Sequence, residues 1–138
     1  MKTLISVLGL LLLGVGIAGS QTAPYRVVFD LTSRDSLDQK AVVRWIKEIT
    51  VPNPNAEVEV VMYGKGFELV MPEKSAFLSE VQSDLANPKV SFKVYQIAMK
   101  NNKIEKSQLL PGVQTVPDGI YEIISKQHDG WGYIKAVH

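Results

Sequence analysis

The sequence contains no cysteine among its 138 residues. This absence excludes disulfides, thiolate metal sites and cysteine nucleophiles, but it does not identify the redox compartment. An excess of charge of one sign is also lacking, because 15 Lys and Arg residues balance 14 Asp and Glu residues. A strong electrostatic case for binding nucleic acid or anionic lipid is therefore excluded. The hydrophobic content of 46% and charged content of 21% instead predict one globular domain.

The N-terminus has the pattern of a secretory signal peptide. Met1 and Lys2 form a short positive start, residues 3–18 are an uncharged apolar run, and Ala18-Gly19-Ser20 is a small-x-small site. The run is shorter than the roughly 20 residues that a spanning helix prefers, which makes an uncleaved anchor the weaker alternative. No cysteine follows, so a lipoprotein anchor is excluded. We expect cleavage after residue 20, which leaves residues 21–138 as a neutral periplasmic or secreted domain.

Segments typical of strands and helices alternate along this domain. Short apolar runs rich in β-branched residues predict five strands, near residues 25–31, 56–63, 90–94, 113–116 and 131–137. Apolar stripes and breakers predict helices between them. The first helix is expected to begin with a capping box of Ser36 and Gln39 and to carry an apolar stripe from Leu37 to Ile49.

The alternation predicts an α/β fold of three layers, in which helices cover both faces of a mostly parallel five-stranded sheet. Glu57 and Glu59 alternate with valines in the second strand, which is typical of an edge strand with one partly wet face. A flavodoxin-like strand order of 2-1-3-4-5 would place that strand at an edge.

Ligands of such sheets bind beyond the carboxyl ends of the strands, which selects the loops 32–36, 63–67, 95–98 and 116–118. In the second loop, Gly64, Lys65 and Gly66 match neither a P-loop nor a dinucleotide fingerprint. They form either an anion-binding turn with backbone N–H groups and Lys65 facing the ligand, or a plain turn that needs positive φ. The motif is too short to favour the first interpretation.

Other candidates for chemistry are weak. Asp30 and Asp35 flank the first loop, and paired carboxylates can serve acid–base chemistry or hold Mg²⁺. No third carboxylate or histidine converges with them, however, and Asp35 better fits the start of the following helix. The two histidines, His128 and His138, form no triad or ligand set with other residues. The aromatic segment 131–134 is interpreted as core or as an oligomer interface, and we predict no catalytic residue, metal site or cofactor.

Several segments, taken in their order and spacing, resemble the DsrE/DsrF-like family, and most of all its secreted branch. The resemblance covers essentially residues 24–135 and is more specific in the C-terminal half. The matching segments are YGKGFEL (63–69), VYQIAMK (94–100), LLPGV (109–113), VPDG (116–119), Gln127 and GWGYIK (130–135).

The resemblance implies a compact YchN-like α/β fold that assembles into trimers or hexamers. Active members of the family relay sulfur as a persulfide on a cysteine after the third strand, in a pattern that reads roughly Cys-x-Asn-Thr-Met. This sequence has Tyr95-Gln96-Ile97-Ala98-Met99 there, so that only Met99 matches. A phenol cannot carry a persulfide, and cysteine-based sulfur transfer by this chain alone is therefore excluded.

The sequence leaves three functional hypotheses. The first is a periplasmic or secreted DsrE-like protein that is non-catalytic and acts as a homo-oligomeric binding or structural module, in which Tyr95 lines or plugs the former pocket. The second is a binder of a small molecule or anion, with Gly64, Lys65, Gly66, Tyr95 and Gln96 at the carboxyl edge of the sheet. The third is a cysteine-free subunit of a sulfur-transfer complex, in which a DsrE-like paralogue supplies the cysteine.

Overall fold

The structure is a computed structural model, and it describes residues 22–137. The expected signal peptide, residues 1–20, lies outside the described residues. Within the described part of the chain, no helix has the length and apolar character needed to span a bilayer.

The described chain alternates between strands and helices, as the sequence predicts. The strands are β1 (Arg26–Leu31), β2 (Glu57–Met62), β3 (Val90–Tyr95), β4 (Gln114–Val116) and β5 (Gly132–Lys135). The α-helices are α1 (Ser36–Thr50), α2 (Leu78–Leu85), α3 (Gln96–Asn101) and α4 (Gly119–His128). Two short 3-10 helices, η1 (Gly66–Val70) and η2 (Lys106–Gln108), are also present.

The five strands form one sheet in which every neighbouring pair is parallel, in the order β4-β3-β2-β1-β5. The predicted α/β class is confirmed, but the predicted order 2-1-3-4-5 is wrong. β2 lies at the centre of the sheet because Glu59, which suggests a wet edge in the sequence, is buried at 1% exposure and is neutralised by two lysines. The true edges are β4 and β5, which are short and largely exposed.

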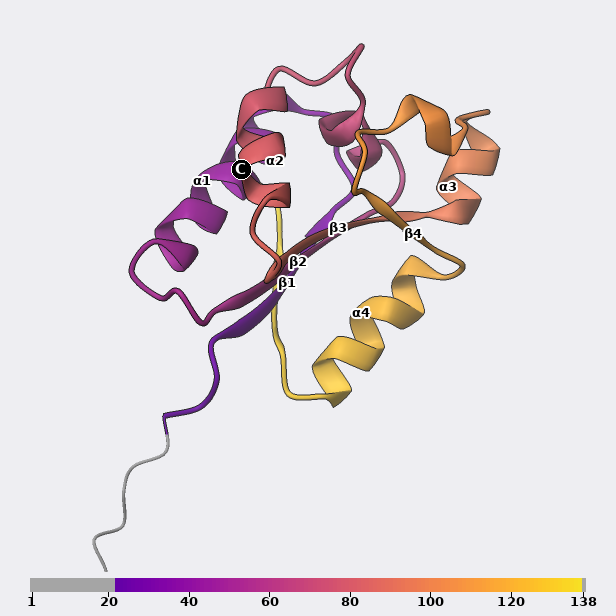
Figure 1. Ribbon diagram of the computed structural model, residues 1–138. Helices are drawn as coiled ribbons and strands as arrows, with labels where there is room; N and C mark the ends of the chain where they lie inside the picture. Colours follow the sequence, from indigo (N-terminus) through magenta and orange to yellow (C-terminus); the bar gives the residue numbers. More distant parts are fainter. Residues whose placement is uncertain (1–21, 138) are drawn as a thin grey trace, which may run out of the picture.

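The strand order also explains where the helices lie. From β1 to β4 each new strand is added on the same side of the previous one, and then β5 returns to the far side of β1. Right-handed crossovers therefore place α1 and α2 on one face of the sheet and α4 on the other. Figure 1 shows this division, with α4 alone below the sheet and α3 at the end of β3.

The two faces are unequally packed. The main core lies under α1 and α2 and contains the largest buried side chains, including Phe29, Phe67 and Phe92. The α4 face holds a much smaller cluster of Val28, Val61 and Ile123. Polar groups therefore lie close to the sheet on the α4 face.

The start of α1 differs from the predicted capping box. The cap is Asp35, whose carboxylate accepts a hydrogen bond from the Leu37 N–H at 2.7 Å, and Ser36 is the first helical residue. The predicted role of Asp35 at the helix start is thus confirmed. Leu37 is exposed, and the buried face of α1 begins with Asp38 and Gln39 and continues through Val42 and Ile46.

Candidate functional site

A carboxylate lies within β1, in a run that is otherwise apolar. Asp30 is the penultimate residue of the strand and is only 3% exposed. Its Oδ2 accepts hydrogen bonds from the hydroxyls of Tyr133 at 2.6 Å and Tyr63 at 3.1 Å, whereas its Oδ1 is buried without a hydrogen-bond partner. Buried polar groups are normally satisfied, and Oδ1 is one of four buried side-chain atoms without a partner among the described residues, with Arg26 Nε, Glu59 Oε1 and Asp84 Oδ2. Of these four residues, Asp30 is the one that lines the pocket described below.

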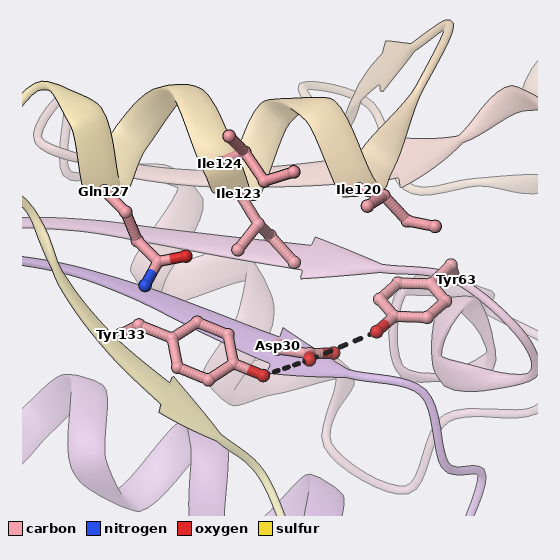
Figure 2. Close-up of a pocket in the computed structure, with 7 residues that line it drawn as sticks. All are labelled: Asp30, Tyr63, Ile120, Ile123, Ile124, Gln127 and Tyr133. Carbon is pink, nitrogen blue, oxygen red and sulfur yellow. Dashed lines mark hydrogen bonds between the residues drawn. The ribbon is translucent and has the colours of Figure 1, made fainter.

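The two tyrosines come from the two strands that flank β1. Tyr63 follows β2 directly, and Tyr133 lies on the edge strand β5 (Figure 2). The hydrogen bond to Asp30, together with burial, raises the pKa of Tyr133 to about 12. Burial, with the charge of Asp30, raises the pKa of Tyr63 to about 12. Both phenols therefore stay protonated and continue to donate at neutral pH.

Helix α4 forms the opposite wall of a pocket of about 180 Å³ over this carboxylate. The helix contributes Ile120, Ile123, Ile124 and Gln127 to the lining. In Figure 2, Ile123 and Gln127 point from the helix toward the two tyrosines. The pocket thus has a polar floor on the sheet, an apolar wall on the helix and one side-chain amide.

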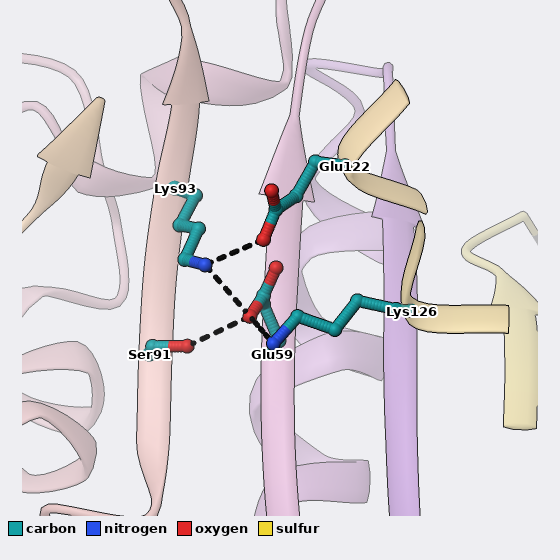
Figure 3. A network of polar contacts seen from close by, with 5 residues as sticks. All are labelled: Glu59, Ser91, Lys93, Glu122 and Lys126. Carbon is teal, nitrogen blue, oxygen red and sulfur yellow. Dashed lines mark hydrogen bonds and ion pairs between the residues drawn. The ribbon is translucent and has the colours of Figure 1, made fainter. Parts of the chain in front are cut away.

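A partly buried cluster of charged residues links α4 to the sheet (Figure 3). Oε2 of Glu59 lies 3.1 Å from Nζ of Lys93 on β3 and 3.1 Å from Nζ of Lys126 on α4. Lys93 also donates to Oε1 of Glu122 on α4 at 2.5 Å. Two carboxylates and two ammonium groups neutralise one another, so this cluster fixes the height of the helix above the pocket.

The charges in this cluster depend on one another. Burial raises the pKa of Glu59 above its usual value, and the nearby lysines work against that rise. Burial acts to lower the pKa of Lys93, but its bonds to Glu122 and Glu59 outweigh this effect and raise it. Every charged member has an opposite charge in contact, unlike Asp30, which takes part in none of the ion pairs found among the described residues.

The predicted glycine turn lies at the same sheet edge, but it is built around β1. Gly64 has φ of +59°, and a β-carbon on Gly66 would lie 2.0 Å from the carbonyl oxygen of Leu31. The Lys65 N–H donates to the Thr32 carbonyl and the Gly66 N–H to the Tyr63 carbonyl, each at 3.0 Å. These contacts account for both glycines as parts of a tight turn and occupy two N–H groups that an anion would need. Anion binding at this turn stays a prediction.

Tyr95 and Gln96 lie at the end of β3 and the start of α3. Tyr95 is half-buried, and a β-carbon on Gly119 would lie 3.1 Å from its Cβ, so Tyr95 packs closely against the start of α4. Gln96 is exposed, and its amide donates to the Thr115 hydroxyl at 3.3 Å. The pocket over Asp30 is lined by none of the five predicted site residues.

The sequence offers only one signal for the observed site, which is an acidic residue inside an otherwise apolar strand, residues 25–31. In the sequence, Asp30 and Asp35 together suggest a pair of carboxylates, but in the structure Asp35 caps helix α1 instead. The sequence favours core or an oligomer interface for Tyr133. This residue is 40% exposed and bonds to Asp30, so it is not part of the core, and the interface stays a prediction. The hydrogen bond between Tyr133 and Asp30 is not predictable, because the expected strand order places β5 at the edge of the sheet that is far from β1.

The pocket presents a carboxylate, two phenols and an amide that can hydrogen-bond to a ligand. The described residues that line the pocket include no nucleophilic serine, histidine or lysine, and both phenols already donate to Asp30. Among the described residues, no group of three or more His, Asp or Glu side chains is placed to hold a metal ion. The pocket lies near the carboxyl end of β1, and the carboxyl ends of parallel strands are where ligands of such sheets bind.

Comparisons with known proteins establish the fold alone. No family model matches the chain, and no curated protein matches it significantly. A solved structure described as a protein of unknown function, MTH1491 from Methanobacterium thermoautotrophicum, is similar with a TM-score of 0.75 and 24% sequence identity. The match covers 80% of this chain and 98% of that one, so the whole of the other fold is represented here.

Proposed function

We propose that this protein is a non-catalytic, DsrE-like binding module that acts in the periplasm or outside the cell and captures a small molecule over Asp30. The observation that carries the proposal is the buried carboxylate at the floor of the pocket, whose Oδ1 has no partner. An isolated polar atom of this kind costs folding free energy, about 1–3 kcal/mol for a neutral group and more for a charged one. A ligand that completes its hydrogen bonding would explain why such a residue is present.

The rest of the proposal is supported by the sequence. The leader-like residues 1–20 favour export, and the segments that resemble the DsrE/DsrF-like family favour that assignment. The position of the family's sulfur-carrying cysteine is occupied by Tyr95, which argues against sulfur transfer by this chain. Binding without covalent chemistry is consistent with a pocket lined by carboxylate, phenol, amide and aliphatic groups.

Homo-oligomerisation is supported by the outer face of α4. Ile120, Tyr121 and Ile124 form an apolar surface on this helix, and each is more than half exposed. Exposed apolar patches of this kind mark interaction sites in soluble proteins. Two of these residues also line the pocket, so a second copy packed here would shield its mouth from water.

A thermal-shift screen tests the binding function. Residues 21–138 are screened against a panel of small amines, alcohols, carboxylates and sugars, in parallel with the variant Asp30→Asn. A true ligand at 100 times its Kd adds about 2.7 kcal/mol to the free energy of unfolding, which raises the Tm by several degrees. We expect at least one compound to stabilise the wild type and not the variant.

The matched control is Asp129→Asn, which removes the same charge from an exposed position at the end of α4. This variant should respond to the compound as the wild type does. A screen in which no compound stabilises the wild type, or in which Asp30→Asn responds equally, would contradict the proposed function.

A further inference from the structure

The Asp30 pocket constrains the chemistry of its ligand, provided that the proposed binding function holds. A carboxylate offers only acceptors, with about four lone-pair sites on its two oxygens. At Asp30, the protons of Tyr63 and Tyr133 both go to Oδ2, and Oδ1 receives none. Oδ1 therefore lacks a hydrogen-bond donor, which a ligand can provide.

The site also lacks a positive charge. The ion pairs among the described residues include two lysines at Glu59 but no cation at Asp30. Lys135 is the residue of β5 in register with Asp30, yet it is exposed and forms no ion pair with it. Two neutral phenols hold the carboxylate, so an incoming cation would meet an anion that no protein cation already compensates.

The walls of the pocket limit the size of the ligand, and they favour an apolar group in the part of the ligand that faces α4. The volume of about 180 Å³ suits only a small molecule, and the wall opposite the carboxylate consists mainly of isoleucine side chains of α4. The amide of Gln127 adds one further polar contact in the lining. Apolar walls around a few convergent polar groups are the usual form of a small-molecule site.

We propose that the Asp30 pocket binds a small primary amine in its ammonium form, with a short aliphatic chain against Ile120, Ile123 and Ile124. The ammonium group carries three N–H donors and a positive charge, and these are the two properties that the partners of Oδ1 would supply and that it lacks. Charge-assisted hydrogen bonds to a carboxylate are about twice as strong as neutral ones. Tyr133 stands on the edge strand at 40% exposure, so its ring is a partly solvent-exposed part of the pocket lining.

Three probes of equal length separate charge from shape. n-Butylammonium, 1-butanol and butyrate are titrated at millimolar concentration into ¹⁵N-labelled residues 21–138, and amide chemical shifts are followed by NMR. We expect saturable shifts in β1, β5 and α4 with butylammonium, and at least tenfold weaker binding of 1-butanol and butyrate. Asp30→Asn should weaken butylammonium binding at least tenfold, while the exposed control Asp129→Asn leaves it unchanged.

A second variant guards against misfolding as an explanation. Tyr133→Phe keeps the ring but removes one of the two phenol hydrogen bonds that stabilise the charge of the Asp30 carboxylate. It should therefore bind butylammonium more tightly than the wild type, by several-fold. A structural role for these side chains predicts no such gain.

The outcomes separate this inference from the proposed function. If 1-butanol or butyrate binds as well as butylammonium, or if only a compound of another class binds in an Asp30-dependent way, the ligand class is wrong and the binding function stands. If no probe binds and the wider thermal-shift screen also finds no ligand, both fail.

Discussion

At the scale of single residues, Asp30 is a buried carboxylate that stands at the floor of a pocket and has no cationic partner among the described residues. A buried carboxylate that stabilises a fold normally has a cationic partner or a full set of hydrogen bonds. Glu59, on the neighbouring strand, has such cationic partners, with lysine contacts to its Oε2 at 3.1 Å from both β3 and α4, although its Oε1 is also unpartnered. Asp30 has two phenols on one oxygen and nothing on the other. The contrast within one sheet supports a binding role for Asp30.

The tyrosine–carboxylate geometry predicts an unusual alkaline titration. Tyr63 and Tyr133 should lose their protons near pH 12 in the folded protein, and near 10 when unfolded. Because the pKa of each phenol is higher in the folded than in the unfolded protein, the protonated phenols contribute to the free energy of unfolding. This contribution is fully present below pH 10 and is lost as the pH rises through 12. NMR of ¹³C-labelled tyrosine rings measures both pKa values directly.

Substitution of Asp30 should affect the two phenols unequally. The hydrogen bond to Asp30 is the main cause of the raised pKa of Tyr133, whereas burial is the main cause at Tyr63. In Asp30→Asn, the pKa of Tyr133 should therefore fall further toward 10 than that of Tyr63. Equal titration of both phenols near 10 in the wild type would show that the contacts to Asp30 do not form.

At the scale of secondary-structure elements, much of the protein is predictable from its sequence. The five strands and the α-helices follow from β-branched runs, apolar stripes and breakers such as Gly130, which adopts φ of +86° after α4. The predicted cap of α1 differs from the observed one by one residue, since Asp35 and Ser36 can both accept the same hydrogen bond and only the backbone geometry distinguishes them. Local patterns therefore identify elements better than their boundaries.

Helix α4 carries a prediction about assembly. If its outer face packs on another copy of the chain, Tyr121→Lys should convert an oligomer into monomers without lowering the Tm, because Tyr121 is 67% exposed. Ser83→Lys on α2, at an exposed position on the opposite face of the sheet, is the matched control and should leave the assembly intact. Size-exclusion chromatography with light scattering measures the mass.

We expect a trimer or hexamer for the wild type and the Ser83→Lys control. A strict monomer at micromolar concentration for the wild type would remove oligomerisation from the proposed function. An oligomer that persists in Tyr121→Lys would place the interface elsewhere on the molecule.

At the scale of the whole molecule, the strand order decides whether the site can be foreseen. The glutamates of β2 indicate an edge strand, because the sequence does not reveal that Lys93 and Lys126, which are 34 and 67 residues beyond Glu59, neutralise the buried carboxylate. With β2 placed at an edge, β5 is expected far from β1, and Tyr133 cannot be connected with Asp30. The parallel sheet is predictable from local alternation, but the site depends on contacts between distant segments that no local pattern records.

The central claim is that Asp30 is retained for a ligand and not for the fold, and the free energy of unfolding of Asp30→Asn tests it most directly. Asparagine keeps the size of the side chain and can still accept from a phenol, while it removes a buried charge with a free oxygen. Urea unfolding of ligand-free protein should therefore give a free energy equal to that of the wild type within about 1 kcal/mol, or higher. A loss of about 3–5 kcal/mol, as when one partner of a structural buried pair is removed, would contradict the account.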